Sequence, residues 1–262
     1  MNAPEQLGDQ DRAILRAANR VGWLQWQGCG RGGNAVLVRV GGRDAILTNA
    51  HQIFDSKTGK TLGRCQNAAE TRGRFYPNAS YRDLGNTFRN RALDARFSVG
   101  VTMDSKLSGM NAQNRFTLQN DYLLMFLEVD ISNREAPDGQ IRGYVPFSSN
   151  PIGADVPGYI VGFDPRFDQD HGGQAMSYQA CRFSIKTRLV IDHTCDATKG
   201  SSSSLLAVFE NGELRLRGVN TAVRLPIGTT APTTENRSEW NIGIPAETFL
   251  THWKSLSVEY GE

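Results

Sequence analysis

The order of hydrophobic and polar positions predicts a chain made mainly of short β-strands. Only two stretches repeat apolar residues at helical spacing: Asp9–Val21, where Asp9 can act as the N-cap, and Ala246–Leu256. Gly41-Gly42 and Asn211-Gly212 are typical of two-residue hairpin turns. The predicted strands are Ala35–Val40, Asp44–Asn49, Phe97–Met103, Asp121–Val129, Gly158–Phe163, Cys181–Lys186, Arg188–His193, Leu205–Phe209, Glu213–Ala222 and Trp240–Ile244. Many short strands with helices only at the ends indicate an all-β barrel or sandwich.

A composition change suggests two β lobes of similar size. The segment Ser132–Pro157 is rich in Pro, Gly, Ser and Asn and is the expected boundary. We therefore expect an N-terminal helical extension at 1–21, one β lobe at 22–135, and a second lobe with a C-terminal helix at 136–262. A length of 262 residues suits either one large β domain or two such lobes.

Charge and composition narrow the function classes. The 29 basic and 27 acidic residues give a net charge of 29 − 27 = +2, so neither nucleic acid nor an anionic membrane is an expected partner. Hydrophobic residues at 39% are typical of a globular chain. No apolar run approaches the roughly 18 residues of a membrane span, and the start lacks the apolar region of a signal peptide. The chain is either cytoplasmic or begins after a removed leader.

One segment resembles a nucleic-acid surface in composition. Gly63–Arg96 holds seven arginines against three acidic residues, a local balance of 7 − 3 = +4, with aromatic residues interleaved. Such a mixture can bind single strands. A solvated, arginine-rich insertion is the simpler interpretation.

The four cysteines allow three pairings, and none forms a CxxC motif. Cys181 and Cys195 flank two short predicted strands around Lys186–Arg188, so they lie at equal distances from a hairpin turn. Residues so placed face one another within disulfide reach. The alternatives are a disulfide, which implies an oxidising compartment, or two small buried thiols. The pairing of Cys29 and Cys65 stays open.

Three local patterns carry candidate chemistry. The stretch Ile46–His51 is an apolar strand end that delivers a histidine, and Asn120–Leu127 has an aspartate that opens an apolar strand. Cys195–Ser204 is a glycine-serine turn before a strand. A serine needs a neighbouring imidazole to accept its proton, and the imidazole needs a carboxylate to fix its tautomer. Taken singly, each pattern is more often a surface histidine, a turn aspartate or a flexible loop; their joint occurrence predicts an activated serine.

With these motifs, the chain resembles the trypsin-like (chymotrypsin-fold) serine peptidases, particularly the bacterial branch with glutamyl-endopeptidase-like members. The carrying residues are Leu47-Thr48-Asn49-Ala50-His51, then Asp121-Tyr122-Leu123-Leu124, then Cys195-Asp196-Ala197-Thr198-Lys199-Gly200-Ser201-Ser202. The resemblance covers about Gly22 to Trp253. It implies two six-stranded antiparallel β-barrels with the active site in the cleft between them.

The resemblance also implies roles for single residues. His51 corresponds to the general base, Asp121 to its orienting carboxylate and Ser202 to the nucleophile. The N–H groups of Gly200 and Ser202 would form the oxyanion hole. On the residues alone, Ser201, Ser203 and Ser204 compete with Ser202; the motif spacing selects Ser202.

Three positions depart from the family pattern. Ser203 replaces the glycine that normally follows the nucleophile, and Leu205 replaces a proline. If the backbone there needs a positive φ, a Cβ costs about 1–2 kcal/mol. Ser201 stands where vertebrate-type enzymes carry aspartate, so activation by a new N-terminal ammonium is not expected.

Substrate preference is left open between basic and small or medium side chains. Asp196 aligns with the base of the primary pocket in trypsin, which favours Lys or Arg. The far wall maps to Asn220, Thr221, Ala222 and Val223. Asn220 replaces the histidine of glutamate-specific relatives, and the branched Val223 would narrow the entrance.

The hypothesis is a serine endopeptidase that forms an acyl-enzyme on a peptide or protein substrate. No cofactor and no metal are expected; Asp164–His171 could hold calcium but is better explained as a solvated turn. The alternative is a catalytically silent pseudopeptidase that serves as a binding or scaffolding module. An α/β-hydrolase would place serine before histidine, which excludes it. Family habit and the paired cysteines favour a secreted or periplasmic protein, of unknown oligomeric state.

Overall fold

The computed structural model describes residues 8–26, 31–55, 62–63, 65, 73–78, 121–136, 139–148, 150, 153, 155–163, 176–187, 190–197, 200–223 and 241–251. Its elements are α1 (Asp9–Ala18), β1 (Val21–Trp26), β2 (Arg31–Val40), β3 (Arg43–Thr48), η2 (Ala50–Gln52), β4 (Gly73–Pro77), β5 (Leu123–Phe126), β6 (Val156–Gly162), β7 (Ser177–Thr187), β8 (Val190–His193), β9 (Leu205–Glu210), β10 (Glu213–Val223) and β11 (Asn241–Pro245). Residues 246–251 are helical.

The N-terminal helix forms where expected but begins differently. Gly8 is the N-cap and makes no side-chain capping bond, so the prediction that Asp9 caps the helix is wrong. Asp9 lies in the first turn, where its negative charge interacts favourably with the helix dipole. Its carboxylate also contacts the Arg12 guanidinium at 2.5 Å, one helical turn further along. The helix ends at Ala18 because the chain turns there and enters β1 at Val21.

The N-terminal strands form an antiparallel five-stranded sheet in the order β4-β1-β2-β3-β5, which we call the open sheet. The sequence analysis missed β1 and β4. Gly22 in β1 explains part of this, because it breaks the apolar alternation yet is required by close pairing. A Cβ on Gly22 would lie 2.1 Å from the carbonyl oxygen of Tyr76 in β4.

The C-terminal strands close into an antiparallel six-stranded barrel in the order β10-β11-β8-β7-β6-β9, which we call the closed barrel. Both predicted hairpin turns are confirmed. Gly41 and Gly42 join β2 to β3, and Asn211 and Gly212 join β9 to β10; all four have positive φ, as a tight two-residue hairpin turn requires.

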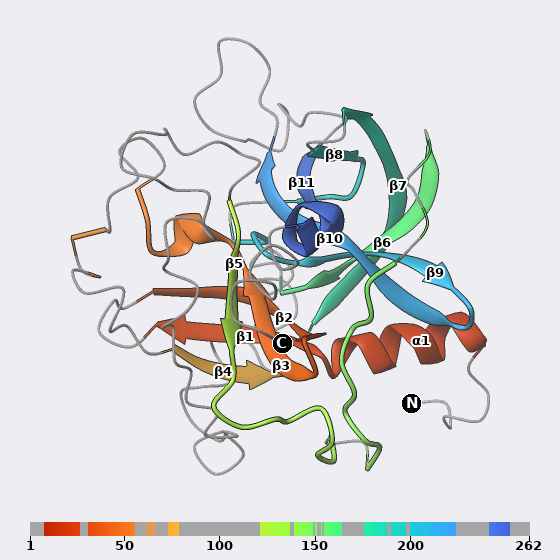
Figure 1. Ribbon diagram of the computed structural model, residues 1–262. Helices are drawn as coiled ribbons and strands as arrows, with labels where there is room; N and C mark the ends of the chain where they lie inside the picture. The colour runs from red at the N-terminus through yellow and green to blue at the C-terminus, as the bar shows by residue number, and fades with distance from the viewer. Residues whose placement is uncertain are drawn as a thin grey trace.

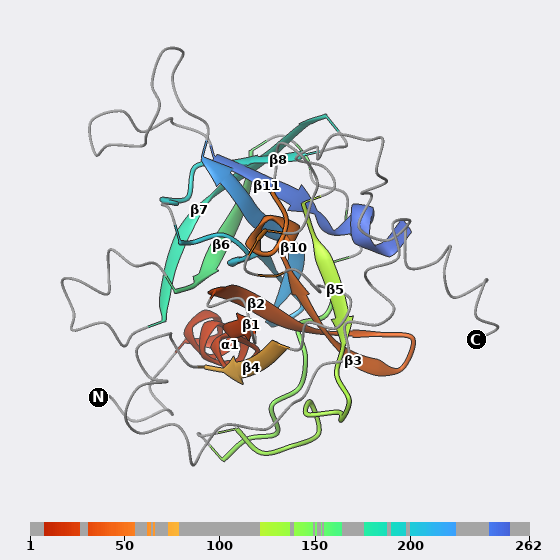
Figure 2. The ribbon, with the colours of Figure 1, turned by 90° about the vertical axis from the view of Figure 1, so that its left-hand side faces the viewer.

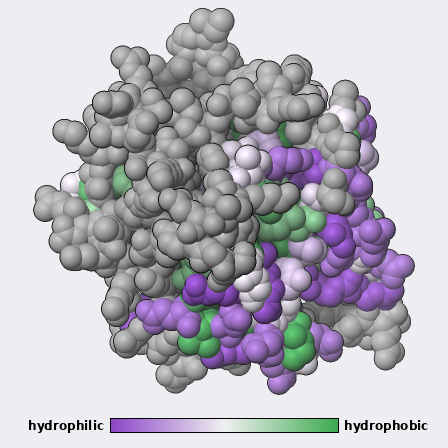
Figure 3. All heavy atoms as spheres, viewed as in Figure 1, coloured by the Kyte–Doolittle hydropathy of each residue, from purple (hydrophilic) through white to green (hydrophobic). Residues whose placement is uncertain are grey.

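The open sheet and the closed barrel pack against each other and against α1 (Figures 1 and 2). Helix α1 contacts β10 and β6 of the barrel and β1 of the sheet. One buried apolar cluster spans all three parts, with Ala13 and Ile14 from α1, Val36 from β2 and Leu205 from β9 among its members. On the face seen in Figure 3, hydrophilic residues predominate among the described ones.

The predicted fold class is confirmed as mostly β with helical segments near both ends. The difference lies in the first lobe, since the open sheet is not closed within the described residues. The predicted strand Phe97–Met103 and most of the arginine-rich segment 63–96 lie outside the described residues. Strands β1 to β5 belong to the open sheet, and strands β6 to β11 belong to the closed barrel. A domain boundary at 135/136 stays a prediction.

The disulfide between Cys181 and Cys195 is present, which confirms the hairpin argument. Phe183 of β7 pairs with His193, the last residue of β8, and each cysteine lies two residues beyond this pair, Cys181 within β7 and Cys195 after β8. Cys65 is also disulfide-bonded, and Cys29 lies outside the described residues. Among the described helices, none is long and apolar enough to cross a membrane.

Candidate functional site

Strand pairing in the open sheet brings His51 and Asp121 together. β3 and β5 are antiparallel neighbours, with Thr48 opposite Leu123. The chain leaves β3 after Thr48 into η2, which contains His51, and it enters β5 just after Asp121. Two residues far apart in sequence therefore meet at one edge of the sheet.

The contact between these residues is an imidazole–carboxylate pair. His51 Nδ1 lies 2.6 Å from Asp121 Oδ2, and the backbone N–H of His51 donates to Asp121 Oδ1 at 2.8 Å. The Thr221 hydroxyl of β10 also donates to Asp121 Oδ2. The carboxylate is buried, whereas the His51 side chain is 31% exposed. A buried acceptor at Nδ1 fixes the tautomer and leaves Nε2 available as a proton acceptor.

The four serines after Gly200 have different exposures. Ser201, Ser203 and Ser204 are buried, with at most 2% of their surface exposed. Ser202 alone of the four is partly exposed. A nucleophile must be reached by substrate, so accessibility favours the same serine that the motif spacing selects.

The turn also leaves particular N–H groups free. The N–H of Ser203 donates to the Asn220 carbonyl, and that of Ser204 to the Ser201 carbonyl. In the described part of the chain, the N–H groups of Gly200 and Ser202 have no hydrogen-bond acceptor. Gly200 has φ 112°, which a side chain would disfavour. An oxyanion site needs N–H donors of this kind aimed at one point, so these two groups are the candidates for it.

One route from the serine turn to the histidine–aspartate pair runs through β10. Thr221 bonds Asp121 from the barrel side, and the backbone of its neighbour Asn220 pairs with the turn through Ser203 and Ser204. Within the described residues, no hydrogen bond joins the Ser202 hydroxyl directly to His51.

A buried histidine is hydrogen-bonded to the side chain of Asn220. His193 Nε2 lies 3.1 Å from Asn220 Oδ1, and Asn220 Nδ2 donates to the Ser201 carbonyl at 2.9 Å. His193 is fully buried, and its desolvation lowers its pKa from 6.5 to about 4. The ring is therefore neutral near pH 7. No role for His193 was predicted from the sequence.

The residues assigned to a substrate pocket are partly engaged inside the protein. The side chain of Asn220 bonds His193 and Ser201, and that of Thr221 bonds Asp121. Asp196 is half-buried and lines a very small cavity of about 10 Å³ beside Ser201 and Ser204. Ala222 is half-buried, and the β10–β11 pairing is irregular between Asn220 and Ala222.

Several polar residues that the sequence analysis missed join the sheet to the barrel. Asn34 in β2 is buried; its Nδ2 donates to the carbonyls of Phe163 at 3.0 Å and Gly200 at 3.2 Å. The Phe163 N–H returns a bond to Asn34 Oδ1 at 2.8 Å. Gln52 is buried beside Trp26, whose indole N–H donates to it. For Asn34, the available signal was a polar residue inside an otherwise apolar strand, whereas Gln52 lies in η2 and had no such signal.

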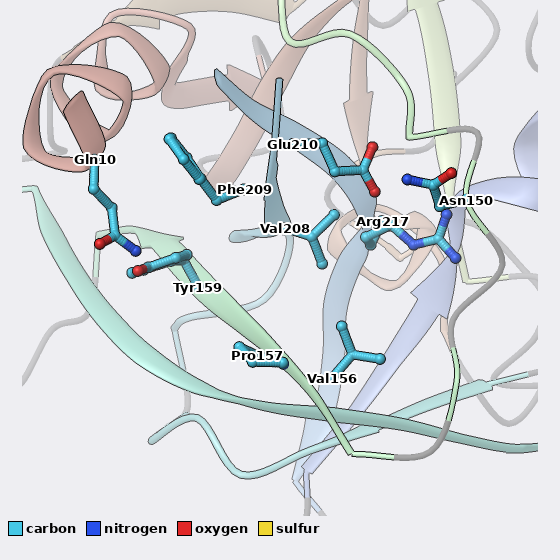
Figure 4. A pocket seen from close by; sticks show the side chains of 9 residues that line it. All are labelled: Gln10, Asn150, Val156, Pro157, Tyr159, Val208, Phe209, Glu210 and Arg217. Carbon is cyan, nitrogen blue, oxygen red and sulfur yellow. The ribbon is translucent and has the colours of Figure 1, made fainter. Parts of the chain in front are cut away.

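A larger pocket of about 300 Å³ lies away from these residues (Figure 4). It lies on β6, β9 and β10 near α1, and its lining is Gln10, Asn150, Val156, Pro157, Tyr159, Val208, Phe209, Glu210 and Arg217. In the described ranges, no group of three or more His, Cys, Asp or Glu residues is arranged to hold a metal ion. The segment Asp164–Asp170, where calcium was considered, lies outside them, as does His171.

The sequence matches no protein-family model and no curated protein. Solved structures do match. A thermostable serine protease, AL20, from an extremophilic microorganism has a TM-score of 0.58 at 13% identity, covering 93% of this chain and 99% of that one. A Glu endopeptidase in complex with MPD has a TM-score of 0.56 at 12% identity, and the match covers 92% of this chain and 91% of that one. A serine endoprotease from Yersinia pestis has a TM-score of 0.55 at 16% identity, and the match covers 97% of this chain and 68% of that one. The chain therefore has the fold of the trypsin-like, chymotrypsin-fold serine proteases.

Proposed function

We propose that this protein is a serine endopeptidase with His51, Asp121 and Ser202 as its catalytic residues. The observation that carries the proposal is the bond between His51 Nδ1 and the buried Asp121, in a histidine that stays partly exposed. It is supported by Ser202, the partly exposed serine of the nearby turn. The similar solved structures, which are serine proteases, support the reaction class.

The proposed mechanism has two steps. The Ser202 oxygen attacks the peptide carbonyl carbon while His51 Nε2 accepts the hydroxyl proton. The N–H groups of Gly200 and Ser202 stabilise the oxyanion, a donation worth about 3–4 kcal/mol per donor in such sites. Protonated His51 then donates to the leaving amine, and the acyl-enzyme remains. Water, deprotonated by His51, hydrolyses the ester and regenerates the Ser202 hydroxyl.

Asp121 acts through the imidazole rather than on the substrate. Its carboxylate holds His51 Nδ1–H and stabilises the imidazolium that forms in each step. The Thr221 hydroxyl and the His51 backbone N–H also donate to this carboxylate. Three donors hold this buried carboxylate in one orientation.

For the substrate, we infer a peptide or protein whose side chain enters beside Asp196 and Ala222; the side chain of Val223 lies outside the described part of the structure. The side chains of Asn220 and Thr221 are engaged internally, so we do not assign them a contact with that side chain. A preference for a basic side chain would be set by Asp196, and a preference for a smaller one by Val223. Cleavage of a peptide library, randomised at the substrate residue whose side chain enters this pocket, decides between them.

We also propose that the protein works in an oxidising compartment, secreted or periplasmic. The Cys181–Cys195 disulfide carries this inference, because such bonds persist mainly outside reducing cytoplasm. Localisation of the native protein by cell fractionation tests it; recovery only from the cytoplasm contradicts it.

Covalent labelling by a fluorophosphonate, followed by intact mass, tests the proposed function. The native chain should gain one adduct, whereas Ser202→Ala and His51→Ala should gain none. Ser204→Ala is the matched control, since it removes a buried hydroxyl from the same turn and should still be labelled.

A catalytically silent pseudopeptidase is the competing function. Two observations favour it: Ser203 has φ 65° where the resembling family has glycine, and within the described residues Ser202 makes no hydrogen bond to His51. Catalytic hydrogen bonds of this kind often tighten only with substrate bound. A folded native chain that takes no label would establish the silent protein.

A further inference from the structure

The residue after the proposed nucleophile has an unusual combination of properties. Ser203 adopts a left-handed backbone with φ 65° and is completely buried. A non-glycine residue in this conformation is strained unless its side chain makes local bonds. The Ser203 hydroxyl makes no such local bond; all of its hydrogen bonds reach across from the barrel to the open sheet, to residues about 150 positions earlier in the chain.

The bonds use the whole capacity of the hydroxyl. Ser203 Oγ donates to Asn49 Oδ1 at 2.6 Å. It accepts from the Asn49 backbone N–H at 2.8 Å and from Gln52 Nε2 at 3.0 Å. A serine hydroxyl has one proton and two lone pairs, so it is saturated. Thr48 Oγ1 also lies 3.0 Å away, and it can direct its own proton to the Asn34 carbonyl at 2.9 Å.

The partners of Ser203 surround the histidine and touch the aspartate. Asn49 lies two residues before His51, and Gln52 comes directly after it. Asn49 Nδ2 also donates to the Asp121 carbonyl at 2.7 Å. One buried hydroxyl, adjacent in sequence to Ser202, is thus bonded to both sides of the segment that carries His51.

We propose that Ser203 is a positioning residue that fixes the distance between Ser202 and His51 through these bonds. The inference rests on the proposed function and deepens it. Its central claim is that the serine at this position is required in this chain, and is not a tolerated replacement for the glycine of the resembling family. A saturated polar network in a buried site holds its members in one arrangement.

The two interpretations predict opposite outcomes for Ser203→Gly. Glycine relieves the positive φ, so a merely tolerated serine predicts an equal or faster reaction. Loss of the hydroxyl frees Asn49 and Gln52, so the positioning role predicts a slower one. A small misplacement of reacting groups can cost on the order of 100-fold in rate; we expect a loss of roughly 10- to 100-fold.

The experiment measures inactivation of the full chain by a fluorophosphonate over a range of concentrations. For Ser203→Gly, the maximal inactivation rate should fall while the concentration for half-maximal rate and the final one-to-one stoichiometry are unchanged. Partial unfolding would instead lower the stoichiometry. Thermal unfolding by circular dichroism confirms that each variant is folded.

Two more variants separate the causes. Ser203→Ala keeps the strained backbone and loses the bonds, so it should be at least as slow as Ser203→Gly if it folds. Asn211→Gly changes another left-handed residue, φ 52°, in the exposed hairpin turn between β9 and β10, and should leave labelling unchanged.

The outcomes are distinguishable. A native chain that labels while Ser203→Gly labels equally fast or faster overturns the positioning role and leaves the proposed function standing. A folded native chain that takes no label overturns both. A slow Ser203→Gly with full stoichiometry supports the positioning role.

Discussion

On the side of the open sheet, the turn at residues 200–204 meets uncharged hydroxyl and amide groups from Asn34, Thr48, Asn49 and Gln52. On the side of the closed barrel, it meets Asn220, which is itself bonded to a buried histidine. We call these the sheet side and the barrel side of the turn. Both are buried hydrogen-bond networks, yet only the barrel side contains a group that titrates.

This difference separates two ways of holding a catalytic turn. The sheet side has no ionisable group among the four residues above, so its bonds should not depend on pH in the range where proteins stay folded. The barrel side depends on a neutral His193, because a buried imidazolium without a counter-charge is costly. Acid should therefore weaken the turn from the barrel side first.

The largest predicted effect on the rate comes from replacing Asp121, which is hydrogen-bonded from both the open sheet and the barrel. Asp121 accepts from His51, which follows the sheet strand β3, and from Thr221 of the barrel. Asp121→Asn would favour the wrong tautomer of His51 and should lower the rate of peptide hydrolysis by about 10⁴-fold. Hydrolysis is measured under single-turnover conditions, with thermal unfolding as the folding control. A rate within tenfold of the native chain would contradict the assignment of Asp121.

The next effect concerns acid stability on the barrel side. His193 has a pKa of about 4 in the folded chain and about 6.5 when unfolded, so the unfolded state binds the proton first. The stability that depends on neutral His193 is complete above pH 6.5 and is lost as pH falls towards 4. The loss amounts to about 3 kcal/mol.

His193→Gln tests this assignment, because glutamine keeps an N–H donor but does not titrate. Urea unfolding at several pH values should give a flatter profile for the variant between pH 6.5 and 4. Two parallel profiles would show that His193 does not cause the acid sensitivity.

A smaller effect is expected for the link between barrel and aspartate. Thr221→Val keeps the shape of the side chain and removes the hydroxyl that donates to Asp121. A hydrogen bond to a charged group contributes about 1.5–3 kcal/mol, so the acylation rate should fall by roughly 10- to 100-fold. Thr221→Ser retains the hydroxyl and should restore most of the rate. Equal acylation rates for Thr221→Val and Thr221→Ser would show that the Thr221 hydroxyl does not contribute to the reaction.

The smallest effect should come from Asn211, which shares its backbone conformation with Ser203 but lies far from the site. Asparagine is well tolerated in this conformation, and the turn is exposed. Asn211→Gly should change the free energy of unfolding by less than about 0.5 kcal/mol. A change above about 1 kcal/mol in denaturant melts would show that the two left-handed residues cannot be compared in this way.

The parts of the structure that could be predicted have local signals. The hairpins follow from Gly41-Gly42 and Asn211-Gly212, whose turn geometry selects those residues, and the disulfide follows from equal spacing about a turn. The approach of His51 to Asp121 follows from two strand-end motifs once β3 and β5 pair.

The parts that could not be predicted depend on contacts between distant segments. Asn34 and Gln52 are polar residues in or beside apolar strands, and nothing in the local pattern indicates that they bond the barrel or the serine turn. The role of His193 depends on complete burial beside Asn220, which only the folded barrel creates. The missed strands β1 and β4 have weak patterns and are held by their neighbours.

The central claim is that Ser202, and no other serine of the turn, is activated. Fluorophosphonate-labelled native protein would be digested, and the modified residue of the peptide containing residues 200–204 located by fragment-ion mass spectrometry. We predict the adduct on Ser202 alone, because Ser203 is saturated by hydrogen bonds and Ser201 and Ser204 are buried. An adduct on any of those three serines, or a folded chain with no adduct, would contradict the account.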